Sequence, residues 1–178
     1  MNILSHFPSH LTPRKQQADI LLAVERAWSS HDVFVISAPT ATGKEAIAST
    51  IAAWNGPAVC LVPNNMLLEQ YASHSPKTAV LRRQSEYWCE VAEMDCEVAK
   101  AKKFCEACSL KDSCGYLRSV DRARKNMVAV SNYYSYLANR LYKPTLIVDE
   151  AHLLLNMLQD LATKKIWQKE YGWPKDAT

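Results

Sequence analysis

Short apolar runs alternate with helical patterns along most of this 178-residue chain. Continuous apolar runs are typical of strands buried on both faces of a sheet, and we predict strands over residues 33–37, 58–62, 78–81, 127–131 and 145–148. Apolar positions at helical spacing predict helices over residues 13–29, 45–54, 64–71, 116–125, 132–141 and 151–163. Strands that alternate with helices predict an α/β fold with a parallel sheet and right-handed crossovers.

Residues 85–115 interrupt this alternation. The segment has no pattern of a buried strand, it mixes charges of both signs, and it contains five of the six cysteines. We therefore expect one α/β domain, formed by residues 1–84 and 116–178, and a cysteine-rich insert of residues 85–115. A chain of this length has room for one complete core and a small insert.

Composition narrows the class of protein only slightly. The chain is 48% hydrophobic and 22% charged, as in ordinary globular proteins, and its net charge of +3 permits contact with nucleic acid without arguing for it. The N-terminus lacks the apolar core of a signal peptide, and no apolar run is long enough to span a bilayer. We therefore expect a cytoplasmic protein with no membrane partner, where clustered cysteines are more often metal ligands or redox groups than disulfides.

The first apolar run leads into a candidate phosphate-binding loop, with the sequence Ala38-Pro39-Thr40-Ala41-Thr42-Gly43-Lys44. A strand, a loop that ends in Gly-Lys and a following helix favour a nucleotide site over an ordinary turn. Backbone N–H groups and the helix dipole would cradle the β-phosphate of ATP, and Lys44 would reach the β- and γ-phosphates. Glu45 stands where Ser or Thr normally holds Mg²⁺. Its carboxylate can also bind the ion, although it adds negative charge beside the phosphates.

An acidic motif at the end of another buried strand supplies the second half of such a site. The segment TLIVDEAH places Asp149 and Glu150 at the carboxyl end of its strand, where α/β sheets bind ligands. Asp149 would hold Mg²⁺, and Glu150 would polarise the attacking water. Acids at a helix start are also favourable by themselves, so the argument depends on their pairing with the phosphate loop.

These motifs together resemble a superfamily 2 helicase of the XPD/DinG type. APTATGKE and DEAH resemble motifs I and II, CLVPNNMLLEQY resembles the DNA-contacting motif Ia, and SNYYSYL resembles the N-Y-x-x-L segment of that branch. LTPRKQQ resembles the R-x-x-Q motif, which would give the adenine contact to Gln17 or Gln16. The resemblance implies a RecA-like P-loop NTPase sheet and a catalytic set of Lys44, Asp149, Glu150 and His152.

Three positions of the loop depart from the family pattern: Ala38 and Ala41 replace glycines, and Glu45 replaces Ser or Thr. The P-loops of sigma-54-dependent activators also carry G-K-E, and that family hydrolyses ATP. We therefore expect a modified but competent ATP site, in which Asp149 and Glu45 hold Mg²⁺.

The cysteines follow the spacing Cys89-x6-Cys96-x8-Cys105-x2-Cys108-x5-Cys114. Such a cluster of thiols suits zinc as well as iron. The resemblance implies a [4Fe–4S] cluster, because helicases of this branch carry one in an insert between motifs Ia and II. It would be held by Cys89, Cys105, Cys108 and Cys114, with Cys96 spare or in place of Cys89, and zinc as the alternative metal.

A helicase motor needs two RecA-like domains, and the pattern of a second one is absent from this sequence. We therefore expect the ATP-binding motor segment of an ATP-dependent DNA helicase, running 5′ to 3′ by resemblance, with a second RecA-like domain in cis or in trans. Alone it should hydrolyse ATP poorly. Single-stranded or forked DNA would be the partner, and Arg118, Arg122 and Lys125 form a helical face that could contact phosphates. The alternative is a non-motor, metal-bearing nucleic-acid-binding module with a degenerate P-loop.

Overall fold

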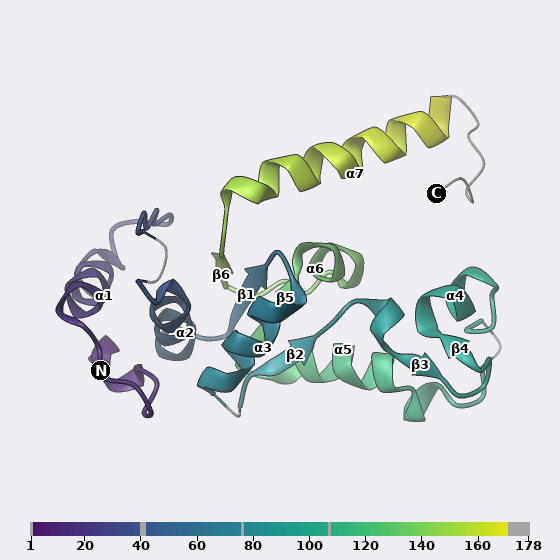
Figure 1. Cartoon of the computed structure of the whole chain (residues 1–178), viewed down its shortest axis with the longest axis horizontal. Coiled ribbons are helices and arrows are strands. Elements are labelled where there is room, and N and C mark those ends of the chain that lie inside the picture. Colours follow the sequence, from purple (N-terminus) through teal and green to yellow (C-terminus); the bar gives the residue numbers. More distant parts are fainter. Residues whose placement is uncertain (1, 40–41, 76, 107, 171–178) are drawn as a thin grey trace.

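The computed structural model describes residues 2–39, 42–75, 77–106 and 108–170. Its centre is a parallel four-stranded sheet in the order β2-β5-β1-β6 (Figure 1). The strands are β1 (Ala58–Val62), β2 (Ala79–Leu81), β5 (Val128–Asn132) and β6 (Thr145–Val148). All five residues of β1 are buried, because β5 pairs with one edge of this strand and β6 with the other. The predicted α/β fold and parallel sheet are confirmed.

Helices cover both faces of the sheet. The main helices are α1 (Lys15–Ala27), α2 (Lys44–Trp54), α3 (Asn65–His74), α5 (Gly115–Lys125), α6 (Tyr133–Asn139) and α7 (His152–Glu170). Because side chains alternate along a strand, Val59 and Leu61 of β1 enter the core under α5 and α6. Cys60 and Val62 enter the core under α2 and α3, so Cys60 is the core residue that its apolar surroundings in the sequence indicate.

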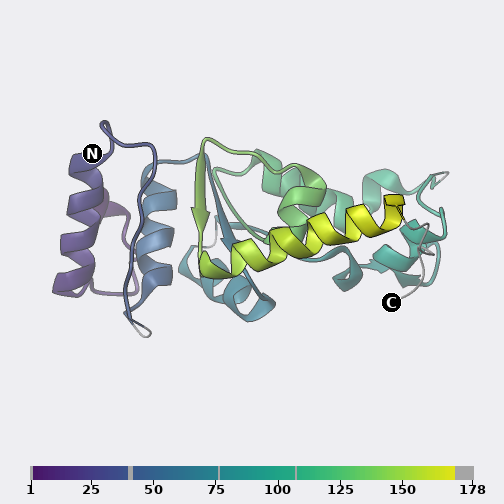
Figure 2. The same ribbon diagram turned by 90° about the horizontal axis from the view of Figure 1, so that it is seen from above.

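A smaller core joins α1 to α2 beside the sheet. It is formed mainly by apolar residues of these two helices and by Ile3 from the short helix η1 (Ile3–His6). Figures 1 and 2 place α1 and the cysteine-rich segment at opposite ends of the molecule. In both views α7 leaves β6 and extends toward the cysteine-rich end. None of the helices in the described ranges carries an apolar stretch long enough to cross a bilayer.

The cysteine-rich segment forms a lobe that packs on the core under α5 and α6 through Cys96. We define it as residues 84–106 and 108–114 and call it the cysteine lobe. Its elements are η2 (Gln84–Glu86), β3 (Trp88–Cys89), β4 (Met94–Asp95), α4 (Cys96–Ala101) and η3 (Lys111–Ser113). β3 and β4 form a short antiparallel pair. The backbone of Cys96 holds the lobe together, because its N–H donates to the Tyr87 carbonyl at 2.7 Å and its carbonyl accepts from the Gln84 amide at 3.1 Å.

The strand predicted over residues 33–37 is wrong. This segment has no strand structure and lies outside the sheet, which leaves β6 as an edge strand. Val33 is 77% exposed and Val35 is 90% exposed, whereas Phe34 between them stacks on Trp28 with ring centroids 5.2 Å apart. Phe34 thus packs against Trp28, the residue after α1, and on the small core between α1 and α2, whereas the segment does not enter the sheet.

Candidate functional site

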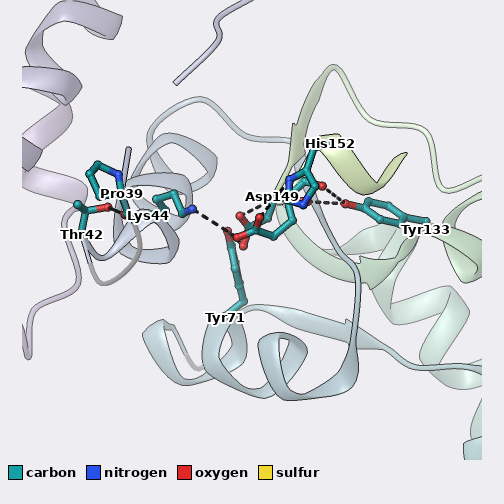
Figure 3. A network of polar contacts seen from close by, with 8 residues as sticks. Pro39, Thr42, Lys44, Tyr71, Tyr133, Asp149 and His152 are labelled. Carbon is teal, nitrogen blue, oxygen red and sulfur yellow. Dashed lines mark hydrogen bonds and ion pairs between the residues drawn. The ribbon is translucent and has the colours of Figure 1, made fainter. Parts of the chain in front are cut away.

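The candidate phosphate loop ends at the start of α2. Gly43 is the N-cap residue of this helix with φ of 72°, a left-handed conformation that glycine adopts without strain, and Lys44 is the first helical residue. The Thr42 hydroxyl donates to the Pro39 carbonyl at 2.8 Å and closes the turn before the helix (Figure 3). Ala38 precedes this turn and is half-buried, whereas the predicted loop residues Thr40 and Ala41 lie outside the described residues.

Gln17 of α1 supports this loop from the side. Its side-chain oxygen accepts from the Arg14 backbone N–H at 2.8 Å, and its nitrogen donates to the Thr42 carbonyl at 2.9 Å. Gln17 is 7% exposed, whereas Gln16 points to solvent. The structure thus places Gln17 against the loop and leaves Gln16 away from it. The contact of Gln17 with adenine stays a prediction.

The acidic motif at the end of β6 contacts Lys44, the residue that follows the loop. The ammonium of Lys44 lies 3.3 Å from one carboxylate oxygen of Glu150, and the other carboxylate oxygen lies 3.3 Å from Nδ1 of His152 (Figure 3). The Asp149 N–H donates to the Leu61 carbonyl at 2.9 Å, which extends the pairing of β6 with β1 by one residue. The structure therefore brings together Lys44, Asp149, Glu150 and His152 near the carboxyl end of β6. Their catalytic roles, which the resemblance implies, stay a prediction.

Glu150 has a φ of 49°, which is unusual for a residue with a side chain. Such a conformation costs of order 1–3 kcal/mol and persists only where surrounding contacts hold it. Here the Glu150 N–H donates to Asp149 Oδ1 at 2.9 Å, and the Glu150 carbonyl accepts from the Tyr133 hydroxyl at 3.3 Å and from the Leu153 N–H at 2.9 Å. The turn that carries both acids is therefore fixed by the site itself.

Two tyrosines that sequence reasoning missed contact Asp149. The Tyr71 hydroxyl donates to Asp149 Oδ2 at 3.2 Å, and the Tyr133 hydroxyl donates to the Asp149 carbonyl (Figure 3). Burial and the neighbouring acids raise the pKa of Tyr133 to about 12, and burial raises the pKa of Tyr71 strongly as well. Both phenols are therefore donors at neutral pH. Both stand inside segments matched to helicase motifs, but motif matching gives no sign of these contacts.

Glu45 lies in the first turn of α2, next to α3. Its carboxylate is close enough to raise the pKa of both Tyr71 and His74, although burial of His74 outweighs this effect and lowers the pKa of that imidazole overall. Tyr71 thus has both Glu45 and Asp149 as acidic neighbours. These two carboxylates, in the first turn of α2 and after β6, are the pair predicted to hold Mg²⁺.

The cysteine lobe encloses a cavity of about 440 Å³. All five cysteines of the lobe line it: Cys89, Cys96, Cys105, Cys108 and Cys114. Cys96 is the most buried at 3% exposure, and burial with neighbouring thiols raises its pKa to about 12. The four predicted ligands are part-exposed at the cavity wall. Their binding of a metal, with Cys96 as the spare thiol, stays a prediction.

Thiols around one cavity suit a thiolate-bound ion or cluster. Within the described part of the chain, however, no three or more Cys, His, Asp or Glu side chains are arranged to hold a metal ion. The thiols thus have the chemistry that a zinc ion or an iron–sulfur cluster needs. Their sulfur atoms would have to move closer together to bind either of them.

The basic face predicted on α5 is present at the surface. Arg118 and Arg122 are exposed and line a shallow cavity of about 270 Å³ together with Lys125. The Lys125 ammonium forms an ion pair with Asp121 at 2.7 Å, which offsets part of the positive charge. The two arginines are therefore the better candidates for contact with a phosphate.

Comparisons with protein-family models, with curated proteins and with solved structures found no match to this chain. The assignment of function consequently depends on the residues and on their geometry.

Proposed function

We propose that this chain is the ATP-binding motor segment of an ATP-dependent DNA helicase of the XPD/DinG type, with a RecA-like core. The observation that carries the proposal is the pairing of Lys44 with Glu150 at the carboxyl end of the parallel sheet, beside Asp149. Lys44 begins α2, and Asp149 and Glu150 follow β6. A lysine at a helix start can bind a triphosphate, and carboxylates at the end of a strand can bind a divalent cation.

Each residue of the site has a distinct task in this proposal. Lys44 and the backbone of the loop bind the β- and γ-phosphates, and Gln17 holds the loop against α1. Asp149 and Glu45 would hold Mg²⁺, which would supply positive charge beside the phosphates. Glu150 orients the attacking water and accepts its proton, while His152 contacts the Glu150 carboxylate and fixes its direction. A second RecA-like domain would complete the site, so hydrolysis by the chain alone should be slow.

The cysteine lobe would hold a [4Fe–4S] cluster through Cys89, Cys105, Cys108 and Cys114, or zinc as the alternative. When bound, such a group would order the lobe beside α5, whose Arg118 and Arg122 would contact the phosphates of single-stranded or forked DNA. Analysis of anaerobically purified protein tests this part. About four irons and four sulfides per chain support a cluster, whereas one zinc without iron contradicts it.

One observation favours a second candidate function, a non-motor nucleic-acid-binding module with a degenerate phosphate loop. Residues 33–37 lie outside the sheet, so the loop lacks the strand that normally leads into it. In that case the acids and Lys44 would form an ion pair without binding a nucleotide.

Titration of the protein with ATP and Mg²⁺ decides between these two functions. We expect wild-type protein to bind magnesium-ATP, Lys44→Ala to abolish binding, and the control Lys102→Ala, which removes an exposed lysine of the cysteine lobe, to bind normally. Equal binding by wild type and Lys44→Ala would contradict a phosphate site at Lys44, and absence of binding by all three would favour the non-motor module.

A further inference from the structure

We infer that Tyr71 is a positioning residue for the divalent cation, and that it does so by holding the Asp149 carboxylate in one orientation. This inference rests on the proposed nucleotide site. It assigns a task to a residue of α3 that the loop and the acidic motif do not include.

The position of the Tyr71 hydroxyl is fixed by packing. The side chain is 2% exposed and belongs to the core formed by α2, α3 and the β1 side chains Cys60 and Val62. At its N-terminus, α3 is capped by Asn64, whose side chain accepts from the Leu67 N–H at 3.0 Å. The phenol therefore extends from α3 through the core to Asp149 at the carboxyl end of the sheet (Figure 3).

The Asp149 carboxylate is held at both oxygens. Oδ2 accepts from the Tyr71 hydroxyl at 3.2 Å, and Oδ1 accepts from the Glu150 N–H at 2.9 Å. An ionised carboxylate has about four acceptor positions, so these two bonds leave about two for a cation or its bound water. The orientation of those free positions is set by the two donors.

Hydrogen bonds from neighbouring groups to a metal-binding carboxylate keep the ligand directed toward the ion. Without Tyr71, the Asp149 side chain would keep only its short-range bond to the next residue and could rotate about Cα–Cβ and Cβ–Cγ. Binding of the cation would then have to order the Asp149 carboxylate, which makes the binding free energy less favourable. Affinity for magnesium-ATP should therefore fall. Affinity for ATP without a metal should stay the same, because the Tyr71 hydroxyl donates to Asp149, whereas Thr42 bonds to Pro39 and Lys44 to Glu150.

The variant Tyr71→Phe removes the hydroxyl and keeps the ring that fills the core. The matched control is Tyr116→Phe, which removes another buried tyrosine hydroxyl, one that donates to Asn139 Oδ1 at 3.0 Å away from the acidic motif. Both variants lose one buried hydrogen bond, so a general loss of stability would appear in both. A thermal unfolding curve for each variant checks that the fold is retained.

The experiment compares dissociation constants for ATP in magnesium and in EDTA. We expect Tyr71→Phe to weaken binding roughly tenfold in magnesium, the lower end for the loss of a hydrogen bond to a metal ligand, and to leave binding in EDTA unchanged. Tyr116→Phe should match wild type in both conditions.

Equal magnesium dependence in Tyr71→Phe and wild type would overturn the inference and leave the nucleotide site standing. Equal weakening in magnesium and in EDTA would also overturn it, because it would mean that Tyr71 supports the fold of the site rather than the cation. Absence of magnesium-ATP binding by wild type would overturn the proposed function and this inference together.

Discussion

The ammonium nitrogen of Lys44 lies 3.3 Å from a carboxylate oxygen of Glu150, although 106 positions separate the two residues in the chain. Both side chains are about one-third exposed, at 30% and 32%, so solvent screens the pair and its contribution to stability is small. Its importance is that ATP and Glu150 would compete for the same ammonium. A bound phosphate would take Lys44 and release Glu150 to act on water.

This competition predicts that Glu150→Gln binds ATP more tightly than wild type while it loses hydrolysis. Removal of the charge frees Lys44, and an exposed ion pair of this kind corresponds to roughly a two- to fivefold change in affinity. Nucleotide titration measures the binding. Asp149→Asn serves as the contrast, since it removes the predicted metal ligand and should weaken binding in magnesium; tighter binding by both variants would show that only net charge matters.

Gln17 gives a second prediction, because its two polar atoms perform different tasks. Gln17→Glu keeps the oxygen that accepts from Arg14 N–H but replaces the donor to the Thr42 carbonyl with a second acceptor. We expect the phosphate loop to detach from α1 and ATP affinity to fall roughly tenfold, the cost of a lost hydrogen bond with an unsatisfied partner. Gln16→Glu adds the same charge at the exposed neighbouring position and should bind ATP normally. Similar losses in the two variants would assign the effect to charge alone.

Gly43 is a restrictive position at the end of the loop. Its φ is +72°, and a Cβ there would lie 2.5 Å from the side-chain nitrogen of Gln17. Gly43→Ala should therefore destabilise the protein by about 1–2 kcal/mol, from backbone strain and from displacement of Gln17. The control is Gly115→Ala at the start of α5, where the nearest atom to a Cβ is 3.9 Å away. That change should be neutral or slightly stabilising, and urea unfolding of both variants provides the comparison.

Sequence patterns located two strands of the sheet accurately. β1 and β6 have the predicted bounds of residues 58–62 and 145–148. The whole of β1 is buried, as expected of an apolar strand covered by helices on both faces, whereas β6 is an edge strand and its Leu146 is 46% exposed. The same signal failed at residues 33–37, where an apolar run packs one aromatic residue against Trp28 and exposes the residues beside it. An apolar run alone therefore does not distinguish a buried strand from a segment that packs through a single side chain.

Some features of the candidate site could likewise be predicted from the sequence, and others could not. The sequence predicted that the phosphate loop and the acidic motif lie at one edge of the sheet. Lys44 does lie beside Glu150, but residues 33–37, the strand expected to carry the loop to that edge, lie outside the sheet. The contacts of Tyr71 and Tyr133 with Asp149 could not be predicted, because they depend on which rotamer each ring adopts in the core. For the cysteines, spacing predicted their grouping around one cavity, but it gave no reason for Cys96 to be the most buried of the five.

His74 predicts a dependence of stability on pH. Burial lowers its pKa in the folded protein, and the stacked ring of His10, 5.6 Å away, acts in the same direction, whereas Glu45 opposes both. The unfolded chain therefore binds more protons near and below pH 6.5, and stability is lost as pH falls below that value. We expect His74→Gln to lose less stability than wild type between about pH 7.5 and pH 5.

Urea midpoints at several pH values test this expectation. His31→Gln, at an exposed histidine, is the control and should follow wild type. If His74→Gln and wild type lose the same stability on acidification, His74 is not the group that titrates.

The cysteine lobe begins after β2 and returns through α5 to β5, and these two strands are neighbours in the sheet, with Leu81 opposite Ser131. Both ends of the lobe therefore come back to almost the same place. In topological terms the lobe is an enlarged crossover connection, so a chain that joined β2 to α5 by a short loop could still close the sheet. The lobe could then be exchanged or redesigned without changing the order of the strands that carry the proposed nucleotide site.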